Sequence, residues 1–418
     1  MPSAIAPSRT ALRGFAKRVL AAGGLLIACT TLADVPASPV LLDGSGVAPP
    51  ATENSSADPL RPYLRGNPAH GWSRGQMGKP TEFWNTRVDQ APVAASSGAV
   101  TQYMSTVSRG DRDDPSSEFF AQFDLGQKIN NEPYSSNVME VDDSTPRYEW
   151  RPRLSEDGFS ENQFFLPHCD RIRMPVPPNG RIQNQLNYEC TGGDCHLYAV
   201  NSGTGQVFEQ WRSHSAGPDI NSYSAGCTNV WELSQKQEPN LRGLSCTSAN
   251  AAGIPYVPLL ITPGEIKEGV IRHAVAFTTL NAWVRRDQYV RPATHNPVNS
   301  RGFGEPEAAP GEAMLYGSRF RLNASFEINP SWSPALRVVL QALKDYGMIH
   351  IDGGPRMIIA SNDFFSEHNW SDPDIAMNPF QLSGVAELSW QDFELVSDTS
   401  QVGSMVDTTC SREPINEF

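Results

Sequence analysis

The chain lacks the short motifs that mark several common classes of enzyme. It has no His-Glu-x-x-His sequence, no phosphate-binding glycine-rich loop before a helix, and no paired-carboxylate strand motif of the laminarinase-like glycosidases. A zinc peptidase of the zincin type and a P-loop enzyme are therefore not expected. No segment repeats at the period of a propeller or a solenoid, which argues against those architectures.

Positive charge is also scarce. The 418 residues carry 33 Lys and Arg against 46 Asp and Glu, which gives a formal net charge of −13. No long basic stretch follows the N-terminal region. Nucleic acid and anionic membrane surfaces are therefore not expected as partners.

No apolar run reaches the length of about 20 residues that a membrane-spanning helix needs. Residues 19–28 form a shorter apolar segment behind four basic residues, which is typical of an export signal. We predict a signal over residues 1–33, with cleavage after Ala33. The alternative is a lipid anchor on Cys29, because residues 26–29 (LIAC) resemble a bacterial lipobox. Both alternatives predict a secreted, cell-surface or periplasmic protein.

Beyond Cys29 there are six cysteines, and an even number in an exported chain indicates disulfides. A zinc site is less favoured, because no Cys-x-x-Cys pair is present. Fifteen pairings are possible. Closeness along the chain favours Cys190–Cys195 and Cys227–Cys246, which leaves Cys169–Cys410.

Proline and glycine are abundant, at 34 and 33 residues, and favour turns and short strands. Residues 34–79 are rich in Pro, Gly, Ser and Ala and are predicted to be a flexible linker. Alternating apolar residues predict strands, for example over 271–277 and 318–328. One short amphipathic helix is predicted at about residues 334–346, capped by Ser333 and ended by Gly347. We therefore predict an all-β, jelly-roll-like β-sandwich over residues 80–405, followed by a tail over 406–418.

The densest cluster of chemical groups lies at a predicted hairpin over residues 195–211. Asp194 and His196 leave the same face of an extended chain, so Asp194 could orient His196 as a catalytic acid or base. Glu209 lies on the returning strand as a second catalytic carboxylate. It shares a face with His196 only if the strands are shifted by one residue from a register that pairs Val200 with Gln206. Purely structural roles for all three residues remain open.

Four further residues are candidates for substrate binding. His273 lies on the apolar side of a predicted strand, with Arg272 facing the opposite side; a buried structural histidine is the alternative. His295 follows the end of a strand that contains proline, where loops often carry sites. Asp352 precedes a Gly-Gly turn, and capping of that turn is its alternative role.

The chain resembles a widespread group of secreted bacterial and fungal β-sandwich proteins of uncharacterised activity. Several short segments match this group and occur in the same order. The most distinctive are residues 247–255 (TSANAAGIP) and 340–348 (LQALKDYGM). Where this chain has Asn250 and Asn323, the group usually has Asp and Lys. The resemblance implies a single domain over about residues 80–405 and no particular activity. The other matching segments are 83–85 (FWN), 194–196 (DCH), 208–209 (FE), 271–274 (IRHA), 292–295 (PATH), 319–322 (RFRL) and 398–400 (DTS).

Two functions are compatible with these features. The first is an extracellular carbohydrate-active enzyme, a polysaccharide hydrolase or lyase, because acid–base chemistry needs two converging groups with separated pKa values. No cofactor is predicted, although a metal held by His196, His273 and His295 remains open. The alternative is a non-enzymatic glycan-binding or structural module, secreted or lipid-anchored, that stacks sugars on aromatic side chains. Its candidate side chains are Trp211, Trp231, Trp283 and Trp370.

Overall fold

The structure is a computed structural model. All described residues belong to one compact unit, which lies within Ser55–Phe418. The predicted export signal, Cys29, most of the predicted linker and Trp370 lie outside them. The described residues are 75–108, 122–123, 128–129, 132–133, 136–153, 167–178, 180–183, 185, 187–216, 223–237, 240–297, 312–354, 357–358, 372, 389–397, 401–404 and 409–417.

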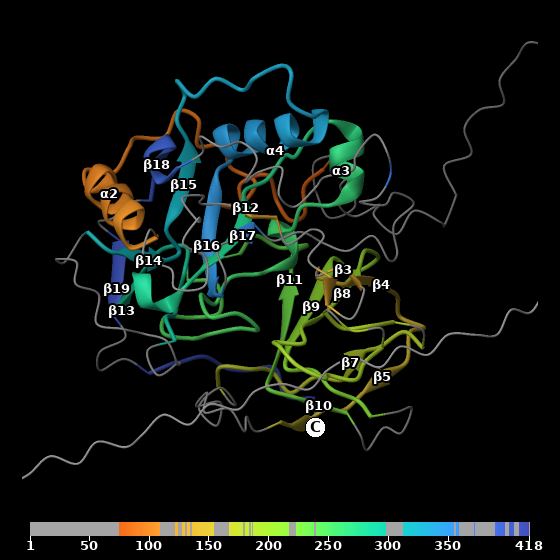
Figure 1. Ribbon diagram of the computed structural model, residues 1–418. Helices are drawn as coiled ribbons and strands as arrows, with labels where there is room; N and C mark the ends of the chain where they lie inside the picture. Colours follow the sequence, from red (N-terminus) through yellow and green to blue (C-terminus); the bar gives the residue numbers. More distant parts are fainter. Residues whose placement is uncertain are drawn as a thin grey trace, which may run out of the picture. The chain divides into compact units, whose positions relative to one another are not determined.

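Strands dominate the described residues and form two larger sheets (Figure 1). The six-stranded sheet has the order β1 (Gln122–Phe123), β17 (Met357–Ile358), β12 (Val275–Thr279), β16 (Met348–Gly353), β15 (Arg319–Leu322) and β18 (Phe393–Leu395). The four-stranded sheet has the order β11 (Cys227–Glu232), β9 (Gln206–Trp211), β8 (Leu197–Asn201) and β4 (Val138–Val141). The smaller sheets are β14 (Met314–Tyr316), β13 (Val284–Val290) and β19 (Val402–Ser404), then β10 (Ser224–Ala225) with β6 (Arg151–Pro152), β2 (Lys128–Ile129) with β3 (Glu132–Pro133), and β5 (Arg147–Tyr148) with β7 (Met174–Pro175).

The predicted β-rich class is confirmed, but the strand order differs from that of an antiparallel jelly roll. Strands β12 and β16 pair in parallel, and so do β4 and β8. Parallel neighbours require a crossover connection, and the crossover between β12 and β16 contains α4 (Pro334–Asp345). An alternating apolar pattern does not reveal which strands become neighbours, so the sequence could not predict these parallel pairs.

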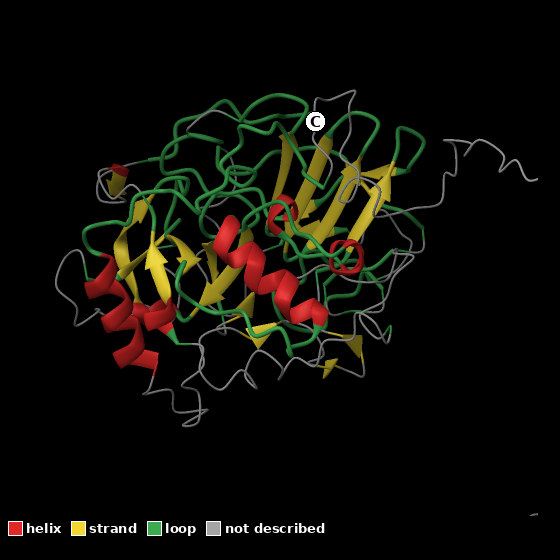
Figure 2. Ribbon diagram, turned by 90° about the horizontal axis from the view of Figure 1, so that it is seen from above, coloured by secondary structure: helices red, strands yellow, loops and turns green. Residues whose placement is uncertain are grey.

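The predicted helix is confirmed as α4, and the Ser333 hydroxyl accepts a hydrogen bond from Leu336 N–H at its start. Gly347 follows with a φ of 71°, in the left-handed region that suits a helix stop. The apolar side of α4 packs against β15. Figure 2, viewed from above, shows α4 lying over the strands. The described residues also contain two α-helices that were not predicted, α2 (Ser97–Ser108) and α3 (Pro263–Glu268). Their short 3-10 helices are η4 (Val257–Leu259), η5 (Asn281–Trp283) and η6 (Trp390–Asp392).

The four-stranded sheet is buried on both faces. Tyr198 and Val207 belong to the larger core, together with Phe277 and Ile349 of the six-stranded sheet. On the other face, Phe208 packs in a second core that contains residues of β4, β7 and β10. Because both faces are covered, β8 is buried at every position. Side chains that leave this sheet at its edges are therefore the ones that can reach a ligand.

Three disulfides join the described residues, as the cysteine count predicts, but only one predicted pair is correct. Cys190 is bonded to Cys195 as predicted, whereas Cys169 is bonded to Cys227 and Cys246 to Cys410. Residues 169–170 run beside the start of β11, where Asp170 N–H donates to the Thr228 carbonyl at 2.7 Å. This pairing between distant segments brings Cys169 to Cys227. None of the described helices has the length and apolar character needed to cross a membrane.

Candidate functional site

A cavity of about 540 Å³ lies where the edges of the two larger sheets meet. Asp194 and Trp211 contribute from the four-stranded sheet, before β8 and at the end of β9. Asn281 and Asp352 contribute from the six-stranded sheet, after β12 and near the end of β16. Residues 247–251, His295 and Tyr316 complete the polar part of its wall.

The carboxyl ends of β12 and β16 place Asn281 and Asp352 side by side. Parallel strands end at the same sheet edge, where open α/β sheets commonly bind their ligands. The register shifts between Phe277 and Thr278, so that Thr278 pairs with Asp352; such irregularities often redirect a side chain beside an active site. Gly353 then permits a close approach, because a Cβ there would lie 2.6 Å from Asn281 Oδ1.

Two histidines hold the small-residue loop that forms one wall of the cavity. His196 Nε2 lies 3.0 Å from the Ala249 carbonyl oxygen, and His295 Nδ1 lies 2.8 Å from that of Ala251. Asn250 closes the loop, since its side chain donates to the Ile254 carbonyl at 2.5 Å and accepts from the Ile254 N–H. The loop therefore presents a fixed surface of small side chains to the cavity.

The two carboxylates of the cavity interact electrostatically. Burial raises the pKa of Asp352 well above its usual range, and the negative charge of Asp194 raises it further. Hydrogen bonds from the N–H groups of Gly353 and Ala251 act in the opposite direction but do not outweigh these effects. Asp194 accepts a hydrogen bond from Trp211 Nε1 at 3.2 Å. The site therefore contains two carboxyl groups, and that of Asp352 is shifted toward its protonated form.

Neutral polar groups surround this pair. Tyr316 donates its hydroxyl proton to Asn281 Oδ1 at 2.5 Å, and burial raises the pKa of Tyr316 well above its usual range. Burial lowers the pKa of His295 to about 3. The His295 ring is therefore neutral near pH 7 and, with Nδ1 donating to Ala251, carries its acceptor at Nε2.

Of the seven predicted site residues, three line the cavity: Asp194, His295 and Asp352. His196 is only 2% exposed and lies behind the loop, where its Nδ1 faces Gln183 Oε1 at 2.8 Å. Burial lowers the pKa of His196, although the Asp194 charge opposes this. Its contacts are those of a residue that positions the loop.

Glu209 pairs with Tyr198 across the hairpin, and Val200 pairs with Val207. This is the shifted register, which puts Glu209 on the same face as His196. Its carboxylate is fully buried and accepts hydrogen bonds from Trp231 Nε1, Tyr256 N–H and Val257 N–H. Burial raises the pKa of Glu209 to about 7, although these hydrogen bonds oppose the shift. Glu209 thus holds the start of η4 and does not line the cavity.

His273 and Arg272 lie away from the cavity, before β12 begins. His273 contacts Glu265 Oε1 at 2.9 Å and the Ala274 carbonyl at 2.8 Å, and Arg272 donates to Glu268 at 3.2 Å. Residues 263–268 form α3, so the acidic partners come from a helix that the strand pattern did not predict.

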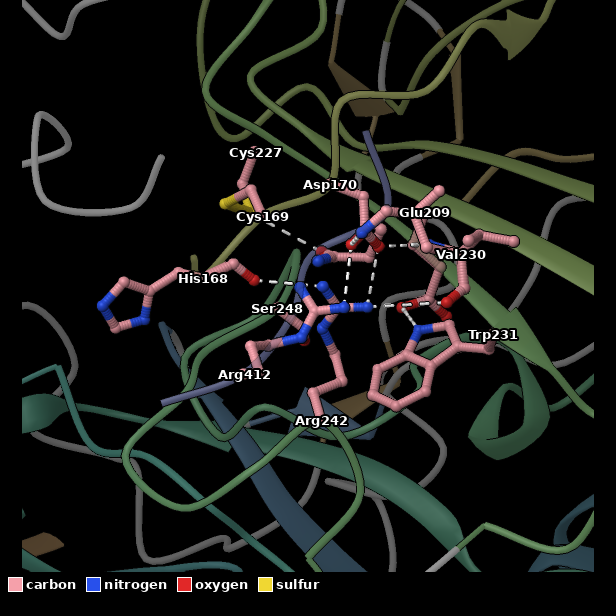
Figure 3. Close-up of polar contacts among 12 residues, drawn as sticks. His168, Cys169, Asp170, Glu209, Cys227, Val230, Trp231, Arg242, Ser248 and Arg412 are labelled. Atoms are coloured by element: carbon pink, nitrogen blue, oxygen red, sulfur yellow. Dashed lines mark hydrogen bonds and ion pairs between the residues drawn. A yellow bond between two sulfur atoms is a disulfide. The ribbon is translucent and has the colours of Figure 1, made fainter. Parts of the chain in front are cut away.

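A buried ion cluster supports the cavity from the side of the four-stranded sheet (Figure 3). Asp170 accepts hydrogen bonds from Arg242 at 2.9 Å and from Arg412 at 2.8 Å. Arg242 also lies over the Trp231 ring, with its guanidinium carbon 5.4 Å from the ring centre. The cluster joins residues 409–417 to the segment that carries Cys169, so these residues are part of the folded unit.

Asn281 and Tyr316 were not predicted as site residues. Neither belongs to a recognisable motif, and only their positions beyond β12 and in β14 bring them to the cavity. A Gly-x-Ser-x-Gly sequence does occur at residues 71–75. A nucleophile elbow requires a helix directly after the serine, and the described residues 75–96 contain none.

The aromatic and metal-binding alternatives find limited support in the described residues. Trp211 lines the cavity, whereas Trp231 and Trp283 are 2% and 7% exposed. Among the residues that the structure describes, no group of three His, Cys, Asp or Glu side chains is arranged to hold a metal ion.

No protein-family model, curated protein or solved structure matches the chain. The resemblance to a group of secreted proteins therefore stays a prediction. Any function must be argued from the cavity itself.

Proposed function

We propose that the cavity hydrolyses glycosidic bonds of an uncharged or cationic glycan, with Asp352 as the general acid and Asp194 as the general base. The observation that carries this proposal is the pair of carboxyl groups lining one cavity, where burial and then the charge of Asp194 raise the pKa of Asp352. Two carboxyl groups with separated pKa values are the usual requirement for glycoside hydrolysis.

In the proposed reaction, protonated Asp352 donates its proton to the glycosidic oxygen as the bond from that oxygen to the anomeric carbon breaks. The Asp194 carboxylate removes a proton from a water molecule, whose oxygen forms the new bond to the anomeric carbon. One water is consumed and two sugar hydroxyls result. Asp194 then releases its proton and Asp352 takes one up, which restores the starting state.

The lining of the cavity favours a hydrolase over a lyase. A polysaccharide lyase must neutralise the carboxylate of a uronic acid, which requires a cation beside it. None of the described residues that line the cavity is Lys or Arg. The proposed Asp194 carboxylate would also repel an anionic sugar, so an uncharged or cationic sugar suits the site better.

The remaining polar groups would orient the sugar. His295 Nε2 can accept a hydroxyl hydrogen, and the Asn281 amide is held by Tyr316. Trp211 offers an aromatic face of the kind on which sugar rings pack. The three disulfides favour action outside the cytoplasm. The proposal does not depend on the jelly-roll-like arrangement predicted from the sequence, which stays a prediction.

The proposal is tested by incubating the full chain with uncharged and cationic polysaccharides and measuring new reducing ends. Asp352→Asn and Asp194→Asn are each expected to lower the rate by about 10²–10⁴-fold, the contribution typical of a general acid or base. Asp142→Asn is the matched control, because Asp142 is an exposed turn residue.

Reducing ends that disappear in both cavity variants but not in the control would support the proposal. Unchanged rates in Asp352→Asn and Asp194→Asn would refute the assigned roles. Products with the ultraviolet absorbance of an unsaturated sugar would instead establish a lyase.

A further inference from the structure

A second hollow lies beside the cavity, at the start of β11. It has a volume of about 450 Å³ and is lined by residues 149–152, 169–172 and 225–228. We call this hollow the groove. Cys227 lines both the cavity and the groove, so the two spaces share part of their walls.

Trp211 marks the junction between them. It lines the cavity, and its indole lies across Gly226, which lines the groove. A Cβ at Gly226 would lie 2.7 Å from Trp211 Cε3, so only glycine lets the ring lie this close to the backbone. The ring thus packs against Gly226, a lining residue of the groove, while its Nε1 donates to the cavity residue Asp194.

The walls of the groove are rigidly joined. Arg151 N–H donates to the Tyr223 carbonyl at 3.0 Å, and β6 pairs in parallel with β10 beside Gly226. The disulfide between Cys169 and Cys227 fixes the opposite wall to β11. The groove is therefore part of the folded structure and keeps its position relative to the cavity.

The chemistry of the groove suits a sugar chain. Trp150 forms part of its wall, packs edge-on against Tyr223 and is 7% exposed. Its buried Nε1 finds no hydrogen-bond acceptor among the described residues, although buried indole N–H groups usually have one. Exposed Glu149, Arg151 and Arg171 form a polar rim. An aromatic wall with an available donor and a polar rim matches the apolar face and hydroxyl edge of a sugar ring.

From the shared residue Cys227 and the packing of Trp211 on Gly226 we propose that the cavity and the groove form a single cleft for a glycan chain, which passes from the two aspartates over Trp211 to Trp150. The inference rests on the proposed function, since it takes bond cleavage to occur in the cavity. It makes the preferred substrate a polysaccharide and not a disaccharide. Contacts in the groove, remote from the reacting bond, would raise kcat/KM for chains long enough to reach it.

The test measures kcat/KM of the full chain on labelled, uncharged oligosaccharides, from disaccharides to octasaccharides of glucose, mannose, xylose and N-acetylglucosamine. For the wild type, kcat/KM is expected to rise with chain length. Trp150→Phe keeps an aromatic ring but removes the N–H. It should lower kcat/KM about fivefold on the longest chains, the effect expected from the loss of one neutral hydrogen bond, and leave the shortest cleaved chains unaffected.

Two further variants separate binding from folding. Arg151→Ala alters the exposed rim without touching the core and should also reduce the advantage of long chains. Trp390→Phe makes the same replacement as Trp150→Phe, but in the core beside Phe320 and Phe393. It should lower kcat/KM equally at all lengths or not at all.

Cleavage that does not depend on chain length, or a length dependence that survives in both Trp150→Phe and Arg151→Ala, would overturn the cleft and leave the proposed function standing. Absence of cleavage at every length would overturn the proposed function and this inference with it.

Discussion

Replacement of Asp170 by asparagine should strongly destabilise the protein, because Asp170 is the only carboxylate hydrogen-bonded to Arg242 in the described cluster. The Asp170 side chain is fully buried and that of Arg242 is 4% exposed. The carboxylate also accepts the N–H groups of Val230 and Ile415, at 3.2 and 3.0 Å. In the variant, an amide NH₂ would face donors and the charge of Arg242 would remain buried without compensation.

Removal of one partner from a buried ion pair costs about 3–5 kcal/mol. Arg242 would keep its hydrogen bond to the His168 carbonyl at 3.1 Å and its contact with the Trp231 ring. These retained contacts place the expected loss near the lower end, about 3 kcal/mol. For comparison, Asp89→Asn removes an ion pair whose Arg87 side chain is 51% exposed, and such pairs contribute about 0–1 kcal/mol.

Urea unfolding followed by tryptophan fluorescence, with the disulfides intact, gives both free energies of unfolding. The pH dependence adds a second check. Burial alone would raise the pKa of Asp170, but Arg242 and Arg412 outweigh it and hold the pKa below its usual value. The ionised carboxylate therefore stabilises the fold above the unfolded-state pKa, and this stabilisation is lost as pH falls through the folded-state pKa. The difference between wild type and Asp170→Asn should shrink in that acidic range. A loss at neutral pH no larger than that of Asp89→Asn would refute the reasoning.

Three other predictions follow from buried or constrained groups. Charge and hydrogen-bond interactions with Glu265 raise the pKa of His273 despite burial. Protonated His273 therefore stabilises the fold fully below the unfolded-state pKa of about 6.5, and this stabilisation is lost as pH rises through the raised folded-state pKa. Thermal melts across this range should show a fall in melting temperature that His273→Asn lacks. Replacing both Cys190 and Cys195 by serine opens a loop whose ends are 5 residues apart, which should lower the free energy of unfolding in urea by roughly 2 kcal/mol. Glycan cleavage should also fall, because Asp194 is next to Cys195 in the chain. Unchanged cleavage would show that the disulfide does not help to position the site. Since Asp352 must be protonated to act, cleavage should fall as pH rises through its raised pKa, and a rate that stays flat into alkaline pH would contradict its role as the acid.

Local patterns predicted the elements whose stability is local. The start, the buried face and the end of α4 could each be predicted from a local pattern: Ser333, the spacing of the apolar residues and Gly347. The hairpin of β8 and β9 needs only a turn between two strand-forming segments. By contrast, α2 has the sequence SGAVTQYMSTVS, whose serines, threonines and valines have modest helix propensity. Burial of Val100 and Met104 on one side, with α2 packed against β18 and η6, supplies what propensity lacks.

The candidate site was only partly predictable for a related reason. Asp194, His295 and Asp352 could be selected as chemically capable residues next to turns. Their convergence depends on the parallel pairing of β12 with β16 and on the contact between two sheet edges. Neither contact can be recognised from a local pattern in the sequence. The predicted strand over 271–277 begins only at Val275, and His273 lies in the connection that follows α3, whose C-cap is Gly269.

The ion cluster around Asp170 also constrains the order in which the molecule can be completed. Arg412 follows Asp170 by 242 positions, and at a synthesis rate of about 5–20 residues per second it leaves the ribosome roughly 10 to 50 s later. During that interval the carboxylate lacks Arg412, and until Arg242 has been made, 72 positions after Asp170, it lacks both arginines. Cys246, once made, waits a further 164 positions for Cys410. A nascent chain can therefore form its hairpins and helices early, but the wall of the groove at Asp170 gains its full set of partners only after residue 415 has been made. Completion of the Asp170 cluster thus requires residues that are made more than 240 positions after Asp170.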